Sequence, residues 1–212
     1  MEELDLLKKD WQKANAFEQI SEAEIYKMLH KKSSSIVKWL LIIGILEFVF
    51  WNIVTVFIND EKYQLKINEY GVSNFMLIIN IINYIILLGF IYMFYKNYKT
   101  ISTTDSTQQL MKNILRTRKT VQNYIWYNLA MVSVTIIITI IMLFNHNPRM
   151  ISLMQNQTQE GHYGFFVCIC VVISIVIILI IIGLFWLFYK LLYGILLKKL
   201  FANYKELKKI EL

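Results

Sequence analysis

The fold is decided by residues 21–58, which read SEAEIYKMLHKKSSSIVKWLLIIGILEFVFWNIVTVFI. The segment begins with a capping-box pattern, in which the Ser21 side chain accepts a hydrogen bond from a first-turn N–H group and the Glu24 side chain reaches back. A basic, half-apolar stretch then leads into residues 39–58, an apolar run of the length needed to cross a bilayer core, about 20 residues. We therefore predict one long helix that begins in water and ends across a membrane, with one carboxylate, Glu47, near the middle of the span.

The composition separates this chain from soluble domains. Of its 212 residues, 57% are apolar, 17% are charged and one is proline, whereas soluble domains contain about 25% charged residues. A soluble fold would have to bury four helices that are apolar on all sides, with too little polar sequence to cover them. The predicted fold class is an all-α integral membrane protein with four transmembrane helices and cytoplasmic helical extensions. The four predicted spans are residues 39–58, 75–95, 124–144 and 165–189.

The distribution of Lys and Arg predicts the orientation, because positively charged segments stay in the cytoplasm. The two tails and the loop 96–123 contain 19 of the 22 basic residues, and the other two loops contain 3. Aromatic residues at the inner boundaries, Tyr189 among them, agree with this placement. We expect both termini in the cytoplasm. The predicted parts are a cytoplasmic amphipathic segment 1–38, a transmembrane domain 39–189 and a basic cytoplasmic tail 190–212.

The amino-terminal segment has an amphipathic pattern that allows two interpretations. It forms a helix on the membrane surface or on the protein's own cytoplasmic face, or it docks a cytoplasmic protein, since helix-in-groove recognition uses anchors at this spacing. The first 38 residues contain seven Lys and seven acidic residues, and this balance favours a protein surface over anionic lipid. The predicted docking residues are Leu4, Leu7, Trp11, Ile25, Met28 and Leu29.

The loop 96–123 and the tail 190–212 are strongly basic. In the loop we predict a linker over residues 96–105, then a second capping box from Ser106 to Gln109 and a helix that continues into the third span. Basic segments next to a membrane favour contact with anionic lipid headgroups. Nucleic acid is not an expected partner, because no nucleic-acid-binding motif accompanies the charge. The predicted headgroup contacts are Lys112, Arg116, Arg118, Lys119, Lys198 and Lys199.

Glu47 is the most informative single residue, because a charged, unpaired carboxylate near mid-bilayer costs about 3 kcal/mol or more. We predict that it faces the bundle interior and joins a polar cluster from the second and third spans. That cluster contains Asn80, Asn83, Tyr84, Ser133 and Thr135. Depth, at about 1.5 Å per residue, selects the last four as hydrogen-bond partners. The carboxyl group is then either a structural hydrogen-bonding group or a proton or cation site.

Enzyme chemistry is not expected from this sequence. No span contains His, and there is no nucleophile elbow, phosphate-binding glycine loop or pair of carboxylates at one depth. In the outer loop, His146, Glu160 and His162 lack the spacing of metal ligands. We therefore predict neither a cofactor nor a metal site.

The amino-terminal part resembles a group of uncharacterised bacterial four-span inner-membrane proteins. The resemblance is carried by LLKKDW at 6–11, IYKM at 25–28 and KKSSSIVKW at 31–39, and it covers residues 4–51 in detail and the whole chain in topology. Some members are automatically labelled beta-carotene 15,15'-monooxygenase, which implies an iron held by several histidines. This chain has three histidines, split between the two predicted sides, so we reject oxygenase chemistry.

The same resemblance implies a bacterial inner-membrane location and a setting beside sigma factors of RNA polymerase. The leading hypothesis is therefore a non-enzymatic membrane protein that presents a cytoplasmic helical surface to a protein partner, as in anti-sigma-like regulation. The alternative is a small transporter or channel subunit that uses Glu47. The substitution Glu47→Gln separates them, because it abolishes proton-coupled flux under the alternative and leaves partner binding intact under the first. Either class is compatible with a homo-oligomer.

Overall fold

The computed structural model describes residues 21–58, 73–104, 106–159 and 161–210. Within these ranges the chain forms five helices and no strand. They are α2 (Glu22–Ile58), α4 (Ser73–Ser102), α5 (Thr107–His146), α6 (Pro148–Gln159) and α7 (Tyr163–Ile210). All but α6 are long and apolar enough to cross a membrane. The predicted all-α fold class with four membrane-spanning helices is confirmed.

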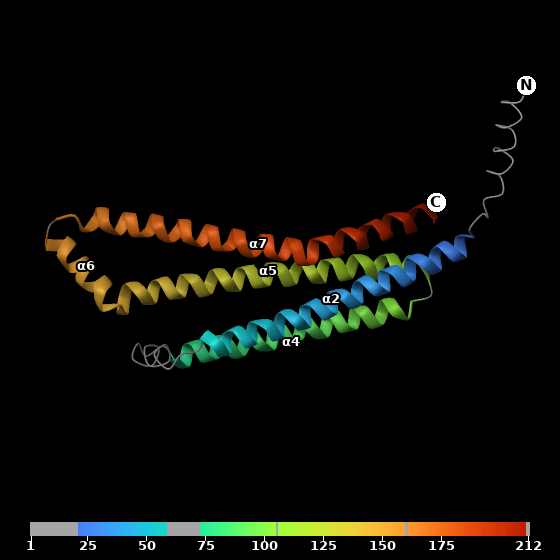
Figure 1. Cartoon of the computed structure of the whole chain (residues 1–212), viewed down its shortest axis with the longest axis horizontal. Coiled ribbons are helices and arrows are strands. Elements are labelled where there is room, and N and C mark those ends of the chain that lie inside the picture. The colour runs from blue at the N-terminus through green and yellow to red at the C-terminus, as the bar shows by residue number, and fades with distance from the viewer. Residues whose placement is uncertain (1–20, 59–72, 105, 160, 211–212) are drawn as a thin grey trace, which may run out of the picture.

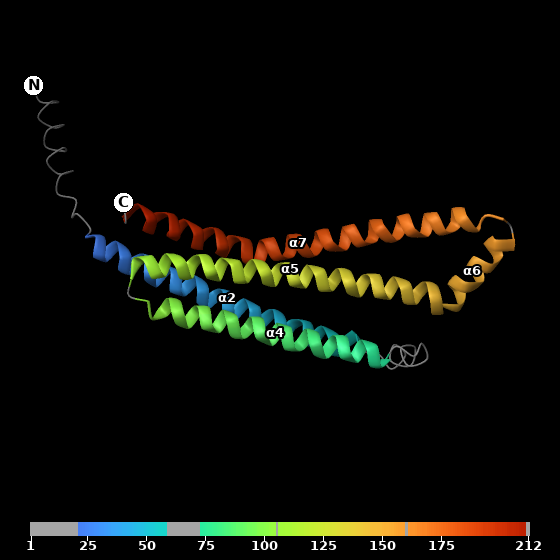
Figure 2. The ribbon, with the colours of Figure 1, turned by 180° about the vertical axis from the view of Figure 1, so that it is seen from behind.

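The long helices form two pairs. α2 packs along α4 and α5 packs along α7, and both views of the molecule show the pairs together at one end and apart toward α6 (Figures 1 and 2). We call the first end the basic end, because α2 starts there, α7 ends there and most of the described Lys and Arg residues lie there. The opposite end, where α6 connects α5 to α7, is the α6 end.

The start of α2 follows the predicted capping box. The Glu24 N–H donates to Ser21 Oγ at 3.3 Å, and the Ser21 N–H donates to Glu24 Oε2 at 3.2 Å. The second predicted box is not formed, because the Ser106 side chain makes no capping hydrogen bond at the start of α5. That turn is held instead by the Asn113 amide, which donates to Thr104 Oγ1, and by the fully buried Leu110.

The predicted linker over residues 96–105 is mostly helical, since α4 continues to Ser102. Tertiary packing explains the difference: Ile101 is fully buried, and the buried Asn97 amide donates to Thr120 Oγ1 of α5 at 3.1 Å. The hydroxyl of Thr100 donates to the Lys96 carbonyl and so fits within the helix. The tight connection between α4 and α5 is therefore only a few residues long.

The connection from α5 to α7, predicted as a loop, contains α6. Two local features start this helix: Asn147 Oδ1 accepts from the Arg149 N–H at 3.0 Å, and Pro148 occupies the first helical position. An asparagine cap followed by proline is a favourable helix start. This local signal is present in the sequence, although the segment is too polar to resemble a membrane span.

The core lies at the basic end. Every described side chain classed as buried lies at, or on the basic side of, the level marked by Glu47, Phe94, Leu129 and Tyr189 on the four long helices. The largest fully buried ones include Leu40, Phe94, Ile101, Leu110, Ile114, Tyr193, Leu200 and Leu207. The polar cavity described below begins where this core ends.

Candidate functional site

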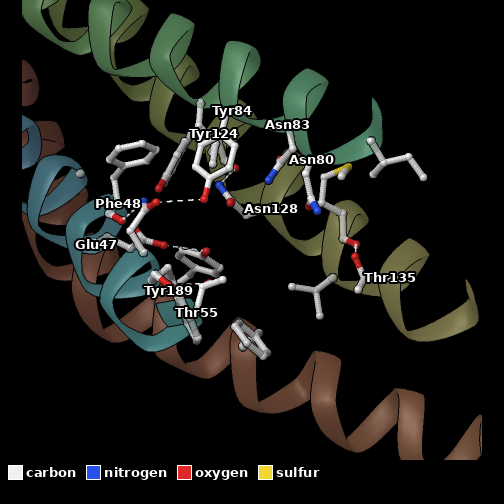
Figure 3. Close-up of a pocket in the computed structure, with 18 of the residues that line it drawn as sticks. Glu47, Phe48, Thr55, Asn80, Asn83, Tyr84, Tyr124, Asn128, Thr135 and Tyr189 are labelled. Carbon is white, nitrogen blue, oxygen red and sulfur yellow. Dashed lines mark hydrogen bonds between the residues drawn. The ribbon is translucent and has the colours of Figure 1, made fainter. Parts of the chain in front are cut away.

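A cavity of about 460 Å³ lies between α2, α4, α5 and α7 (Figure 3). Five of the six residues of the predicted polar cluster line it, and Ser133 does not. Its polar lining consists of Glu47, Asn52, Thr55, Asn80, Asn83, Tyr84, Tyr124, Asn128, Thr135 and Tyr189. The cavity therefore places several hydrogen-bonding groups inside a bundle whose helices are otherwise strongly apolar.

Glu47 lies at the end of the cavity nearest the core and is 5% exposed. The Tyr189 hydroxyl donates to its Oε1 at 2.7 Å, and the Tyr193 hydroxyl donates to its Oε2 at 2.7 Å. The two tyrosines are one turn apart on α7, so both can face the same point on α2. Short bonds of this kind to a carboxylate are among the stronger hydrogen bonds in proteins.

The predicted hydrogen-bond partners of Glu47 are wrong. We expected Asn83, Tyr84, Ser133 and Thr135 from the second and third spans, but both donors come from the fourth. The expected groups have other partners: Tyr84 donates to Asn52 Oδ1, Asn83 Oδ1 accepts from Tyr127, and Ser133 and Thr135 donate to carbonyls of their own helix. Serine and threonine commonly bond back in this way within a helix. The depth of a residue in its span does not determine which side chains hydrogen-bond to Glu47.

Aromatic rings surround the carboxyl group. The Tyr124 ring lies edge-on to Phe94, Tyr189 and Tyr193, with centroid distances of 5.4, 6.3 and 5.8 Å. A Cβ atom at Gly44 would lie 3.1 Å from the Phe94 ring, so glycine allows α4 to approach α2 at this level. We call Glu47, Phe94, Tyr124, Tyr189 and Tyr193 the Glu47 seal. The seal draws on all four long helices and separates the cavity from the basic end.

Two amide side chains of α4 project into the cavity without full hydrogen bonding. Within the described part of the chain, Asn80 makes no side-chain hydrogen bond, and Asn83 uses only its Oδ1, which accepts from Tyr127 at 2.9 Å. Figure 3 shows both side chains directed from α4 toward the space beside Asn128 and Thr135. Unsatisfied amides are costly in an apolar medium. The cavity therefore suits an occupant that can form hydrogen bonds.

The predicted docking residues of α2 mostly face the protein itself. Leu29 is 5% exposed in the core and Ile25 packs against that core, whereas Met28 is 54% exposed. Tyr26 Oη and His30 Nε2 lie 3.0 and 2.7 Å from the carbonyl oxygens of Thr104 and Ile101, which fastens α2 to the end of α4. The remaining predicted docking residues, Leu4, Leu7 and Trp11, lie outside the described residues.

The predicted headgroup contacts lie at the basic end. Lys112, Arg116, Lys119, Lys198 and Lys199 are exposed. Arg118 is half-buried, and its guanidinium carbon lies 4.3 Å from the centroid of the Phe201 ring, so this residue also joins α5 to α7 by a cation–π contact. Among the described residues, no group of three His, Cys, Asp or Glu is placed to hold a metal ion.

The model of one protein family, a domain of unknown function (DUF8845), matches residues 23–212. The match covers most of the chain, so the chain belongs to this family. It includes both helix pairs, the Glu47 seal and the cavity. No curated protein and no solved structure matches the chain.

Proposed function

We propose that the protein is a small, non-enzymatic membrane transporter or channel subunit, in which the Glu47 seal closes a solute cavity. The observation that supports this most directly is the position of the cavity: it lies between all four long helices and ends at a buried carboxylate. Ionisable and polar groups at membrane depth commonly mark substrate or ion pathways.

The arrangement of the helices supports a gating role for the seal. The two hydrogen bonds of Glu47 join α2 of one helix pair to α7 of the other, and toward α6 the pairs diverge (Figure 1). Loss of these bonds would let the pairs move apart at the level of the seal, while the core of the basic end, where the Asn203 amide of α7 donates to Ser33 of α2, still joins them. Transporters of other folds work by such movement of one helical unit against another around a central site.

Proton binding provides a way to open the seal. An ionised Glu47 accepts from both tyrosine hydroxyls. A proton added to one carboxylate oxygen turns that oxygen into a donor, so that the hydroxyl hydrogen of its tyrosine must turn away and the hydroxyl oxygen accept a bond between two neutral groups. The two-donor arrangement is then lost, and proton uptake is coupled to weakening of the contact between α2 and α7.

The charge distribution indicates which end of the bundle faces the cytoplasm in this proposal. In the described chain, the α6 end carries one Lys or Arg residue, Arg149, and the others lie at the basic end. The positive-inside rule supports a cytoplasmic basic end. The cavity of this conformation is closed toward the cytoplasm by the Glu47 seal, with the bacterial plasma membrane as the proposed location.

The test is proton flux into vesicles that contain the reconstituted full chain and a trapped pH-sensitive dye, driven by a potassium diffusion potential. We expect the wild-type chain to acidify the vesicles and Glu47→Gln to abolish the flux. Glu206→Gln is the matched control, because Glu206 is an exposed carboxylate outside the seal. Equal flux through Glu47→Gln and wild type, or no flux above empty vesicles, would overturn the proposal.

Docking of a cytoplasmic protein is the second candidate, and one observation favours it. α7 continues 21 residues past Tyr189 to Ile210, about 30 Å at 1.5 Å per residue. The inner boundary predicted at Tyr189 is wrong, because Tyr189 bonds to Glu47, about 12 Å inside the boundary predicted at residue 39. Lys205, Lys208 and Lys209 then extend about 12–18 Å past that boundary, beyond the roughly 8 Å over which lipid charge acts in physiological salt. Such a surface suits an acidic protein, which could also contact the exposed Met28.

Co-purification from solubilised membranes tests this candidate. The full chain is compared with a chain that begins at Ser21. This deletion stops before Leu29, because a longer one would remove that residue from the core. The triple substitution of Lys205, Lys208 and Lys209 to Glu provides the second comparison. A partner that is lost with either change supports docking, and equal recovery with all three chains contradicts it.

A further inference from the structure

We propose that the cavity binds a neutral amphiphile whose head carries a carbonyl or hydroxyl group, held by the amides of Asn80 and Asn83. The inference rests on the proposed function, since it names the class of solute that the cavity admits. It is carried by the hydrogen-bonding groups that face the cavity, the absence of an available charge among the described lining residues, and the apolar space that adjoins them.

The free groups of the two asparagines define the head. Asn80 offers both an N–H donor and an oxygen acceptor, and Asn83 offers its N–H donors, because Tyr127 already occupies its oxygen. The two residues are three positions apart on α4, so they face the same side of the helix. A carbonyl or hydroxyl oxygen can accept from both amides, and an amide or hydroxyl hydrogen can donate to Asn80 Oδ1.

The charges around the cavity select a neutral head. Glu47 is the only carboxyl group among the described lining residues, and both of its oxygens are already taken by Tyr189 and Tyr193. The described lining contains no Lys or Arg. An anionic head would therefore lack a partner cation, and a cationic head would have to displace a tyrosine hydroxyl from Glu47. Charge without a partner is costly at this depth.

The rest of the cavity accommodates an apolar body. The cavity volume of about 460 Å³ falls within the range of small-molecule sites, roughly 300–1,000 Å³. Next to it, a second space of about 420 Å³ runs between α5 and α7 toward α6, and Thr135, Ile136 and Ile181 line both spaces. The second space is lined mainly by apolar side chains, including Ile140, Leu143, Phe144, Met150, Ile173 and Ile177. An acyl chain can therefore extend from the asparagines toward the α6 end.

Saturable binding of radiolabelled dodecanamide, a neutral single-chain amide, tests this inference. The full chain is placed in phosphatidylcholine nanodiscs, with empty nanodiscs as the blank. We expect binding that dodecanol competes for and that dodecane and dodecanoate do not. No saturable binding above the blank, or equal competition by dodecanoate, would overturn the inference.

The double substitution Asn80→Leu and Asn83→Leu tests the residues. Loss of their hydrogen bonds should weaken binding about tenfold or more, whereas Asn74→Leu, on α4 but outside the cavity lining, should leave it unchanged. Asn83→Leu also removes the acceptor of the Tyr127 hydroxyl, so the melting temperature of the double variant is measured beside its binding. Asn80→Leu alone breaks no hydrogen bond of the described chain, should melt at the wild-type temperature or above, and should still weaken binding. Binding equal to wild type in the double variant contradicts the assignment.

The two proposals can fail separately. Proton flux that depends on Glu47, without dodecanamide binding, overturns the ligand class and leaves the transporter proposal standing. Dodecanamide binding that depends on the asparagines, without any proton flux, supports the site and overturns proton-coupled transport.

Discussion

The half of the bundle at the basic end and the half around the cavity contrast in how they use apolar side chains. The most apolar stretch of α7 has a mean hydropathy of 3.7 and no buried residue, whereas Leu110 and Ile114 of the less apolar basic end are 0% exposed. At the basic end, the hydrophobic effect of water drives the burial of apolar side chains. Lipid solvates apolar side chains as well as the protein interior does, so hydrophobicity alone does not bring helices together in a membrane.

Polar side chains show the same contrast. At the basic end, the buried Asn97 and Asn203 donate to Thr120 and Ser33 at 3.1 and 3.0 Å. Around the cavity, the amides of Asn80 and Asn83 retain unused groups. Paired, buried amides hold helices together, and unpaired amides that face a cavity are available to a solute. Under the proposed function, the paired amides stabilise the basic end and the unpaired amides of the cavity half bind the solute.

The largest expected effect comes from a core deletion at the basic end. Leu110→Ala should lower the free energy of unfolding by about 3 kcal/mol, because it leaves a cavity in a packed core. Leu179→Ala is the matched change in the other half, where the side chain is 63% exposed, and should cost well under about 1 kcal/mol. Titration with sodium dodecyl sulfate measures both. Equal losses would show that the cavity half is packed as tightly as the core.

An intermediate effect is expected at the Glu47 seal. Tyr193→Phe removes the donor to Glu47 Oε2 and should cost about 2 kcal/mol, since a buried carboxylate oxygen loses its partner. Tyr84→Phe, which removes a bond to Asn52 in the more open cavity, should cost about 0.6 kcal/mol, the average for hydrogen bonds between membrane helices. The same titration applies. A larger loss for Tyr84→Phe would place the main inter-helix contact in the cavity half.

The smallest effect distinguishes two glycines. Gly44→Ala should destabilise the fold by about 1 kcal/mol, because the new Cβ lies 3.1 Å from the buried Phe94 ring and overpacking outweighs the helix propensity of alanine. Gly89→Ala meets no heavy atom within 4 Å and should be neutral or stabilising by up to about 1 kcal/mol. Thermal unfolding monitored by circular dichroism checks the sign of each change.

Several features of the fold and site could be predicted from short stretches of sequence. The cap at Ser21 and the four long apolar helices depend on residues within one segment. The buried position of Glu47 follows from the cost of a charge in lipid. The helical end of α4 and the uncapped Ser106 could not be predicted in this way, because contacts such as Asn97 with Thr120 override local preference.

The sequence by itself determined the helices, the span lengths and the presence of one carboxylate among apolar residues, because backbone hydrogen bonds and apolar length are properties of each segment. Only the tertiary structure decided which groups Glu47 contacts. Tyr189 and Tyr193 are 142 and 146 residues away along the chain, and their approach depends on how each helix is rotated and how closely it packs. Helix packing also decided which amide groups of the cavity are unpaired. It brought the Tyr127 hydroxyl to Asn83 Oδ1 and left the Asn80 side chain without a hydrogen bond in the described chain.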